Sequence, residues 1–233
     1  METKINSGTA EMDWLLEGGY DKGIITTIYG PGSSGKTNLL LLCIANSVKG
    51  QKVIYIDTEG SFSLNRYKQI CPDFKKALEK IIFLKPTSFK EQEKAIGHLS
   101  VLIKQDVGAI FVDSITMLYR AELKEEMNRG LNNSLAFQVR TLLEIARKKD
   151  IPVIMTTQVY ADFENKDQVK LVGGNIIKNM SKCLIELKKS GPNRVAIIQK
   201  HRSIEEGKSI MFRIIDEGIK EVKKEETNKE NKN

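Results

Sequence analysis

Residues 30–37 read GPGSSGKT and lie between a short apolar run and a longer run with helical spacing. Glycines at three of these positions let the backbone curl, so that successive N–H groups can point at one anion. A helix that begins here adds the positive end of its dipole. We therefore expect a strand, a phosphate-binding loop and a helix, with Lys36 reaching the β- and γ-phosphates of a nucleoside triphosphate. The predicted nucleotide-binding residues of this segment are Gly30, Pro31, Gly32, Ser33, Ser34, Gly35, Lys36, Thr37 and Asn38.

The rest of the chain alternates between apolar runs of strand length and runs of helical length. We expect strands at 24–30, within 52–60, and at 81–85, 109–114 and 152–158, and helices at 36–50, 65–70, 73–80, 89–105 and 133–150. Helices between strands require crossovers, which make a mainly parallel sheet covered on both faces. Beyond 158, two strands around an SGPN turn and a third at 211–216 predict an antiparallel edge. The predicted fold class is α/β, a mainly parallel twisted sheet flanked by helices.

Length and composition restrict the classes of protein that this chain can belong to. Its 233 residues suit one well-packed domain, which we place at 1–219, followed by a charged and disordered tail at 220–233. The longest apolar run, LLLLCIA, is far shorter than the roughly 20 residues that cross a bilayer, and the N-terminus lacks the apolar core of a signal peptide. The cysteines, Cys43, Cys71 and Cys183, have no metal-ligand spacing. We expect an intracellular protein with ordinary buried thiols and no membrane partner.

Polar side chains at predicted strand ends supply the remaining groups of a triphosphate site. Asp113 ends the 109–114 strand and is the predicted second Mg²⁺ ligand beside the Thr37 hydroxyl. Glu59 follows another strand and is the predicted catalytic group that orients water. Asp57 is the competing candidate, although its position suggests that it serves the strand end or its turn. Gln158 follows a third strand, where it can sense the γ-phosphate.

Basic residues are concentrated in one part of the chain. The formal net charge is +7, and residues 178–202 contain seven basic residues and one acid. They are Lys178, Lys182, Lys188, Lys189, Arg194, Lys200 and Arg202, with Glu186. Such a segment is either a solvated face or a surface for a polyanion, and charge alone leaves both open.

Several segments occur in the order and spacing of a recombinase core. They include SGTAEMDWLLEGGYDKGIITTIYGPGSSGKT, YIDTEGSF, AIFVDSITMLYR, TTQ and GGNII. From Ser7 to Asp216 the chain resembles the RecA/RadA recombinase family, and within it a short archaeal paralogue of RadA. The resemblance implies a RecA-type ATPase core that uses ATP and Mg²⁺, with the roles given above for the loop and the strand ends. It also implies that Arg66, seven residues after Glu59, stacks on the adenine ring; a plain surface arginine is the alternative.

In this family two loops contact DNA, and the resemblance places them at 119–133 and 159–175. The first offers Arg120, Lys124 and Arg129. The second offers Lys170, but its acids Asp162, Glu164 and Asp167 outnumber its lysines, Lys166 and Lys170. Acids oppose the electrostatic attraction that supplies most non-specific DNA affinity, so we expect the second loop to bind weakly.

The basic segment offers a second DNA surface through Lys178, Lys200 and Arg202. Lys200-His201-Arg202 resembles a Lys-x-Arg element that relatives direct at DNA or at the γ-phosphate of a neighbouring subunit. A plain cluster of charges on an edge strand is the alternative, and His201 is expected to be a bystander.

Only six residues precede Ser7, so the N-terminal domain and docking linker of filament-forming relatives are expected to be absent. The FKKA segment at 74–77 has the spacing of that linker motif, but it lies within a helical pattern. The resemblance thus implies an ATP- and DNA-binding mediator of recombination and repair, with weak ATPase activity. Expected partners are single-stranded or branched DNA, a RadA-type recombinase, a junction resolvase and a second copy, in the nucleoid. The alternatives are a KaiC-like signalling ATPase that binds no DNA and, less favoured, a P-loop kinase.

Overall fold

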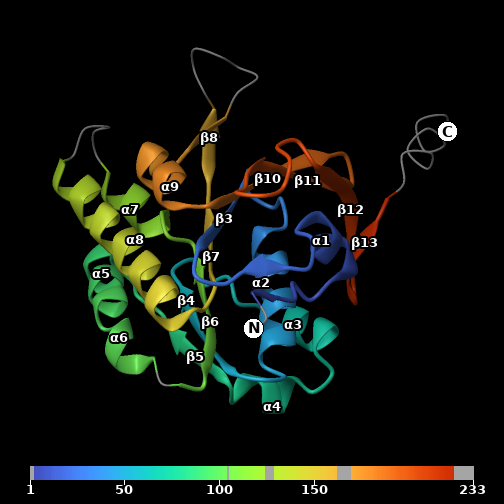
Figure 1. Ribbon diagram of the computed structural model, residues 1–233, viewed down its shortest axis with the longest axis horizontal. Coiled ribbons are helices and arrows are strands. Elements are labelled where there is room, and N and C mark those ends of the chain that lie inside the picture. The colour runs from blue at the N-terminus through green and yellow to red at the C-terminus, as the bar shows by residue number, and fades with distance from the viewer. Residues whose placement is uncertain (1–2, 104, 124–128, 162–168, 223–233) are drawn as a thin grey trace.

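The computed structural model describes residues 3–103, 105–123, 129–161 and 169–222 (Figure 1). A nine-stranded sheet with the order β13-β12-β11-β10-β3-β7-β6-β4-β5 forms its centre. These strands are β3 Ile25–Tyr29, β4 Lys52–Asp57, β5 Ile81–Leu84, β6 Val107–Asp113, β7 Val153–Thr157, β10 Cys183–Ser190, β11 Asn193–Lys200, β12 Ser209–Ile215 and β13 Gly218–Glu221. Two small antiparallel sheets pair β1 Lys4–Ile5 with β2 Tyr20–Asp21 and β8 Val159–Ala161 with β9 Val169–Leu171.

The sheet is parallel from β10 to β5 and antiparallel from β10 to β13. Strands β3, β6 and β7 are buried along their whole length, as expected for parallel strands with both faces covered. The predicted α/β fold with its antiparallel edge is therefore confirmed. All the parallel strands end at the same edge of the sheet, which is where the predicted site residues lie.

Helices cover both faces of the sheet (Figure 1). The helices are α1 Ala10–Leu15, α2 Lys36–Ser47, α3 Leu64–Ile70, α4 Phe74–Leu78, α5 Phe89–Gly97, α6 Leu99–Leu102, α7 Met117–Glu122, α8 Arg129–Lys149 and α9 Gly174–Met180. One apolar core joins α1 to α4 with one face, and a second core joins α5 to α9 with the other. Helix α2 is apolar almost all round, because it lies between the sheet and the α1 and α3 helices.

The structure differs from the sequence prediction in two places. The single helix expected at 89–105 is two helices, which break around Gly97 and His98, since glycine has a low helix propensity and the His98 ring bonds the Lys94 carbonyl. Strand β13 includes Lys220 and Glu221, the first two residues of the predicted tail, so these two belong to the sheet. Residues 223–233 lie outside the described part of the chain.

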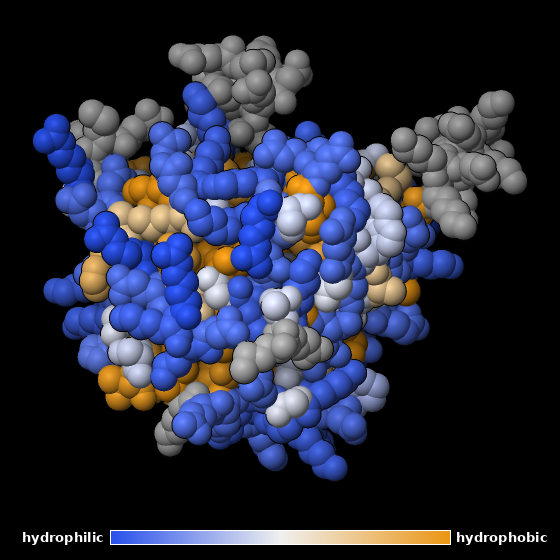
Figure 2. All heavy atoms as spheres, in the orientation of Figure 1, coloured by the Kyte–Doolittle hydropathy of each residue, from blue (hydrophilic) through white to orange (hydrophobic). Residues whose placement is uncertain are grey.

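Hydrophilic side chains cover most of the face of the molecule seen in Figure 2. Within the described residues, no helix is both long enough and apolar enough to span a bilayer. Cys43, Cys71 and Cys183 are free and buried, as predicted.

Candidate nucleotide site and basic surfaces

The GPGSSGKT segment connects the end of β3 to the start of α2. Gly30 lies against the neighbouring strand β10, where a Cβ atom would come within 2.4 Å of the Leu187 carbonyl oxygen, so only glycine fits. Gly35 adopts a left-handed conformation, with φ at +100°, and turns the chain into the helix. The Ser34 hydroxyl is buried and has no hydrogen-bond partner among the described residues. The loop is thus a curved cradle with an unused polar group, which fits a phosphate ligand.

The side chain of Lys36 folds back over this loop. Its Nζ donates hydrogen bonds to the carbonyl oxygens of Gly30 and Pro31, both at 2.9 Å. Burial lowers the pKa of Lys36, and the negative charges of Glu59 and Asp113 act in the opposite direction. The ammonium group therefore lies inside the cradle, where it can bind phosphate oxygens.

Asp113, at the end of β6, accepts hydrogen bonds from four hydroxyl groups. Its Oδ2 accepts from Thr37 at 2.7 Å, Ser61 at 2.8 Å and Tyr55 at 3.2 Å, and its Oδ1 accepts from Thr156 at 2.6 Å. The Thr37 hydroxyl and this carboxylate form an oxygen pair of the type that Mg²⁺ prefers. The sequence motifs identified Thr37 and Asp113 but not the other three, which are positioned by different strands and turns.

Glu59 and Gln158 meet above the ends of β4 and β7. Gln158 Nε2 donates to Glu59 Oε1 at 3.2 Å, and Gln158 Oε1 accepts from Arg120 at 3.2 Å. A residue expected in a DNA-contacting loop is thus bonded to the expected γ-phosphate sensor. Asp57 instead accepts from the backbone N–H of Ser61 at 3.0 Å, which supports its interpretation as a turn residue.

Arg66 lies in α3, which begins at a Ser63 cap whose hydroxyl accepts from the Arg66 N–H at 3.2 Å. Arg66 Nε donates to Asn38 Oδ1 at 2.7 Å. Its other nitrogens donate to the carbonyl oxygens of Asp216 at 2.8 Å and Gly218 at 3.1 Å. The guanidinium is therefore held between the start of α2 and the β12–β13 turn, close to the phosphate loop. Stacking on adenine at this position stays a prediction.

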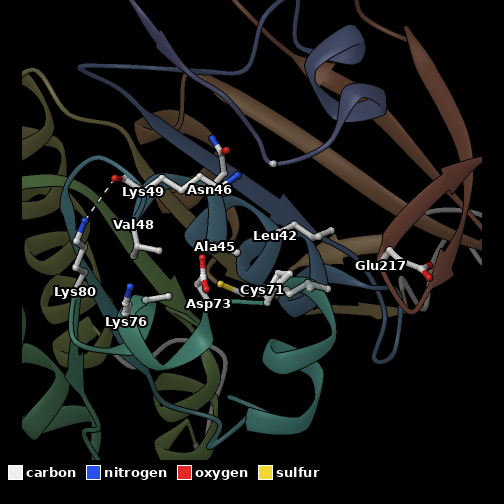
Figure 3. Close-up of a pocket in the computed structure, with 14 residues that line it drawn as sticks. Leu42, Ala45, Asn46, Val48, Lys49, Cys71, Asp73, Lys76, Lys80 and Glu217 are labelled. Carbon is white, nitrogen blue, oxygen red and sulfur yellow. Dashed lines mark hydrogen bonds between the residues drawn. The ribbon is translucent and has the colours of Figure 1, made fainter.

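A separate cavity of about 450 Å³ lies at the opposite end of α2 (Figure 3). Its wall includes Leu42, Ala45 and Val48 of the α2 region and Cys71 and Ala77 of the α3–α4 region. None of the predicted nucleotide-binding residues lines it. The nucleotide site is therefore the loop and the strand ends, and this cavity is not part of it.

Known proteins share this arrangement. A model of the Rad51 family matches residues 2–222. The DNA repair and recombination protein RadB of Methanobrevibacter smithii is 43% identical over 92% of this chain and 93% of its own length. The protein of the same name from Methanocaldococcus jannaschii is 42% identical over 88% and 96%. The crystal structure of a RadB recombinase matches with a TM-score of 0.82 and 38% identity, covering 94% of this chain and all of that one. The chain belongs to the Rad51 family, within its RadB group.

Membership of the RadB group confirms the resemblance to RecA/RadA recombinases and the RecA-type, P-loop core. Such a core implies nucleotide and Mg²⁺ as ligands, and the cradle, Lys36 and the Thr37–Asp113 oxygen pair fit both. The roles of the individual site residues stay predictions.

The basic segment of this RadB-group chain does not form one surface. Strands β10 and β11 pair antiparallel, from Leu184 opposite Lys200 to Ser190 opposite Asn193. Lys200 therefore lies at the end where β3 begins, while Lys188 and Lys189 lie at the end next to the phosphate loop. A strand of this length spans roughly 25 Å. The predicted basic edge is thus two separate groups of cations, a division that charge counting along the sequence could not reveal.

The first group holds Lys200 and Arg202 in internal contacts. Lys200 Nζ donates to the Lys178 carbonyl oxygen at 2.8 Å, and Arg202 pairs with the buried Asp21 at 3.2 Å. His201 Nε2 lies 3.3 Å from the same Asp21 oxygen. Sequence analysis missed Asp21, because nothing in its local pattern shows that β2 lies beside the end of β11.

The other predicted DNA-binding residues lie near the carboxyl ends of the parallel strands. Arg120 in α7 and Arg129 at the start of α8 are exposed, as is Lys170 in β9. The other charged residues named above for the two expected loops lie outside the described residues: Lys124, Asp162, Glu164, Lys166 and Asp167.

His201 is placed so that its neutral form is favoured. Its Nδ1 accepts from the backbone N–H groups of Ser203 and Ile204, both at 3.2 Å, and its Nε2 lies 3.3 Å from Asp21 Oδ2. A proton on Nδ1 would face two N–H donors. Burial lowers the His201 pKa first of all, and the charges of Lys4 and Arg202 lower it further, against those of Asp21 and Glu17.

We expect stability to fall as the pH drops through about 6.5, the ordinary histidine value. Below that pH the unfolded chain binds a proton that folded His201 resists, so protonation favours unfolding. Urea unfolding midpoints at pH 8, 7, 6 and 5.5 measure how stability changes with pH, and His201→Gln should make this change smaller. An equal change in the variant would show that His201 is not the group responsible.

Proposed function

We propose that this chain binds Mg·ATP and DNA and acts in DNA repair and recombination as an accessory of a RadA-type recombinase, with weak ATPase activity. The observation that carries the proposal is the continuous chain of hydrogen bonds from Glu59 through Gln158 to Arg120. It links a candidate catalytic group to a candidate DNA contact. The names of the RadB relatives, which describe DNA repair and recombination, support the same role.

The residues of the site suit hydrolysis of a phosphoanhydride bond by water. Lys36 would bind the β- and γ-phosphates, and Thr37 and Asp113 would hold Mg²⁺, which neutralises the charge that develops on the phosphates. Glu59 would accept a hydrogen bond from the attacking water and orient it in line with the γ-phosphorus. Gln158 would contact the γ-phosphate and change the conformation of the segment that follows β7.

This geometry also gives a reason for slow turnover. Gln158 occupies one oxygen of Glu59, and Arg120 in turn holds Gln158. That hydrogen bond stabilises the carboxylate and makes Glu59 a weaker acceptor for the attacking water, so hydrolysis should be faster once Gln158 moves away. When DNA phosphates attract Arg120, they weaken its bond to Gln158. ATP then serves as a conformational or assembly signal more than as an energy source for strand exchange.

The partners that this function requires are single-stranded or branched DNA and a RadA-type recombinase, together with a junction resolvase and a second copy of the chain. The exposed cations Arg120 and Arg129 support a DNA contact near the carboxyl ends of the strands. Lys178, Lys200 and Arg202 form a second candidate contact at the opposite end, where Asp21 neutralises part of the charge. Arg120 and Arg129 are therefore the stronger candidates for a DNA contact.

Fluorescence polarisation with single-stranded and branched DNA across a salt series tests the proposal. We expect micromolar or tighter binding, with a salt slope that decreases in Arg120→Ala/Arg129→Ala, because each phosphate contact contributes close to one unit of slope. Lys200→Ala/Arg202→Ala tests the second group. Lys148→Ala, an exposed lysine paired with Glu144 on α8, is the control. If no DNA binds at low salt with any nucleotide, the DNA function is wrong, and a signalling ATPase becomes the better description.

A further inference from the structure

The end of the β10–β11 hairpin lies beside the phosphate loop. Strand β10 runs parallel to β3, with Glu186 opposite Tyr29, the last residue before the loop. The Leu187 carbonyl then packs against Gly30 so closely that no Cβ atom fits between them. Lys189 is two residues further along β10, so the hairpin continues along the side of the loop.

Two cations of this hairpin share the face of the sheet that carries α2. Ile185 and Leu187 belong to the same apolar core as α2, and side chains alternate along a strand, so Lys189 lies on their side. Arg194 is directly opposite Lys189 in the antiparallel register and shares its face. The positive charge of Lys189 lowers the pKa of Lys36. Lys188 lies on the other face, where it pairs with Glu186 at 3.6 Å.

These two cations have no carboxylate partner within the described part of the chain. Lys189 is exposed and makes no hydrogen bond or ion pair there. One Arg194 nitrogen donates to the turn carbonyls of Pro192 at 3.2 Å and Asn193 at 2.9 Å, while its Nε is buried without a partner. The like charge of Lys189 lowers the pKa of Lys36, so an anion placed between these two side chains would be favoured. A buried donor without a partner also costs free energy.

We propose that Lys189 and Arg194 extend the phosphate site and bind the terminal phosphate of a nucleoside triphosphate from the β10 side. The inference rests on the proposed ATP binding and adds two phosphate-binding residues outside the GPGSSGKT segment. Lys36 donates hydrogen bonds to the carbonyl oxygens of Gly30 and Pro31, at the start of the loop. Leu187 and the β10–β11 hairpin lie beside this same part of the loop. The pair would therefore distinguish a triphosphate from a diphosphate.

Binding of fluorescent mant-ATP and mant-ADP in the presence of Mg²⁺ tests this inference. Lys189→Ala/Arg194→Ala should weaken ATP binding on the order of tenfold, since a charge-assisted hydrogen bond to phosphate is lost. ADP binding should change less than about twofold. Lys188→Ala removes the same charge one residue away on the opposite face, and it should change neither. Lys189→Ala alone is the second variant, because this exposed side chain makes no contact that folding needs.

The outcomes separate this inference from the proposed function. The inference is overturned if wild type and both variants bind ATP with equal affinity. It is also overturned if Lys188→Ala weakens ATP binding as much as Lys189→Ala/Arg194→Ala does, or if the double variant weakens ADP binding as much as ATP binding. Unchanged ATP affinity with weaker DNA binding would also overturn it and assign the pair to DNA phosphates. If the wild-type chain binds neither nucleotide, the proposed ATP binding itself is wrong. Lys189→Arg, which keeps the charge, should retain most of the ATP affinity.

Discussion

Replacement of Asp113 by asparagine is expected to lower the rate of Mg²⁺-dependent ATP hydrolysis on the order of 10²-fold. The carboxylate is buried at the end of β6 and takes hydrogen bonds from Thr37, Ser61, Tyr55 and Thr156. An amide keeps one acceptor oxygen but has no charge to hold Mg²⁺, and its NH₂ group faces hydroxyls that now donate to Oδ2. Metal affinity and the alignment of Thr37 should therefore decline together.

Single-turnover phosphate release at saturating protein is the measurement, because it detects slow hydrolysis. Asp57→Asn is the matched control, since Asp57 lies opposite Asp113 in the β4–β6 register and bonds only the backbone of its own turn among the described residues. We expect Asp57→Asn to lose stability, while its ATP hydrolysis keeps the same dependence on Mg²⁺ as in the wild type. If the two variants hydrolyse ATP equally well, Asp113 is not the metal ligand.

The candidate residues of the nucleotide site could be brought together from the sequence, because local rules place each of them. A glycine-rich loop binds phosphate wherever a strand and a helix flank it, and parallel strands bring their carboxyl ends to one edge. Glu59, Asp113 and Gln158 could therefore be assigned from the sequence alone to the edge of the sheet where the parallel strands end. The bond between Gln158 and Arg120 could not, since it depends on how α7 packs after β6.

The arrangement of the basic segment could not be predicted from the sequence. Charge counted along the chain treats residues 178–202 as one region, but the antiparallel hairpin places Lys200 at its open end and Lys189 and Arg194 near its turn. Side-chain alternation then separates Lys188 from Lys189. The partner of Arg202, Asp21, comes from a strand about 180 residues earlier, as the numbering shows. Pairings this distant in sequence depend on tertiary packing alone.

Removal of Asp21 should produce the largest loss of stability among the charged residues discussed above. Its carboxylate is buried and lies within 4 Å of His201, Arg202 and Lys4, at 3.3, 3.2 and 3.7 Å. Asp21→Ala removes the negative charge that lies beside His201, Arg202 and Lys4. Loss of one member of a buried ionic cluster costs about 3 kcal/mol, and we place the value at the low end because Arg202 remains half exposed.

Urea unfolding followed by circular dichroism measures this loss, and a chain of this length should also melt roughly 10 °C lower. Glu144→Ala is the matched control, because it removes a carboxylate from the exposed Lys148 pair at 3.8 Å and should change the free energy of unfolding by less than about 0.5 kcal/mol. Asp21→Asn should fall between the two, since it keeps the size and polarity of the side chain but loses the charge. A loss in Asp21→Ala no greater than that in Glu144→Ala would mean that β2 and the end of β11 are held together by apolar packing. The Lys200–Arg202 element would then be free to leave Asp21 for a polyanion at little cost, which would make it a stronger candidate for DNA binding than its buried ion pair suggests.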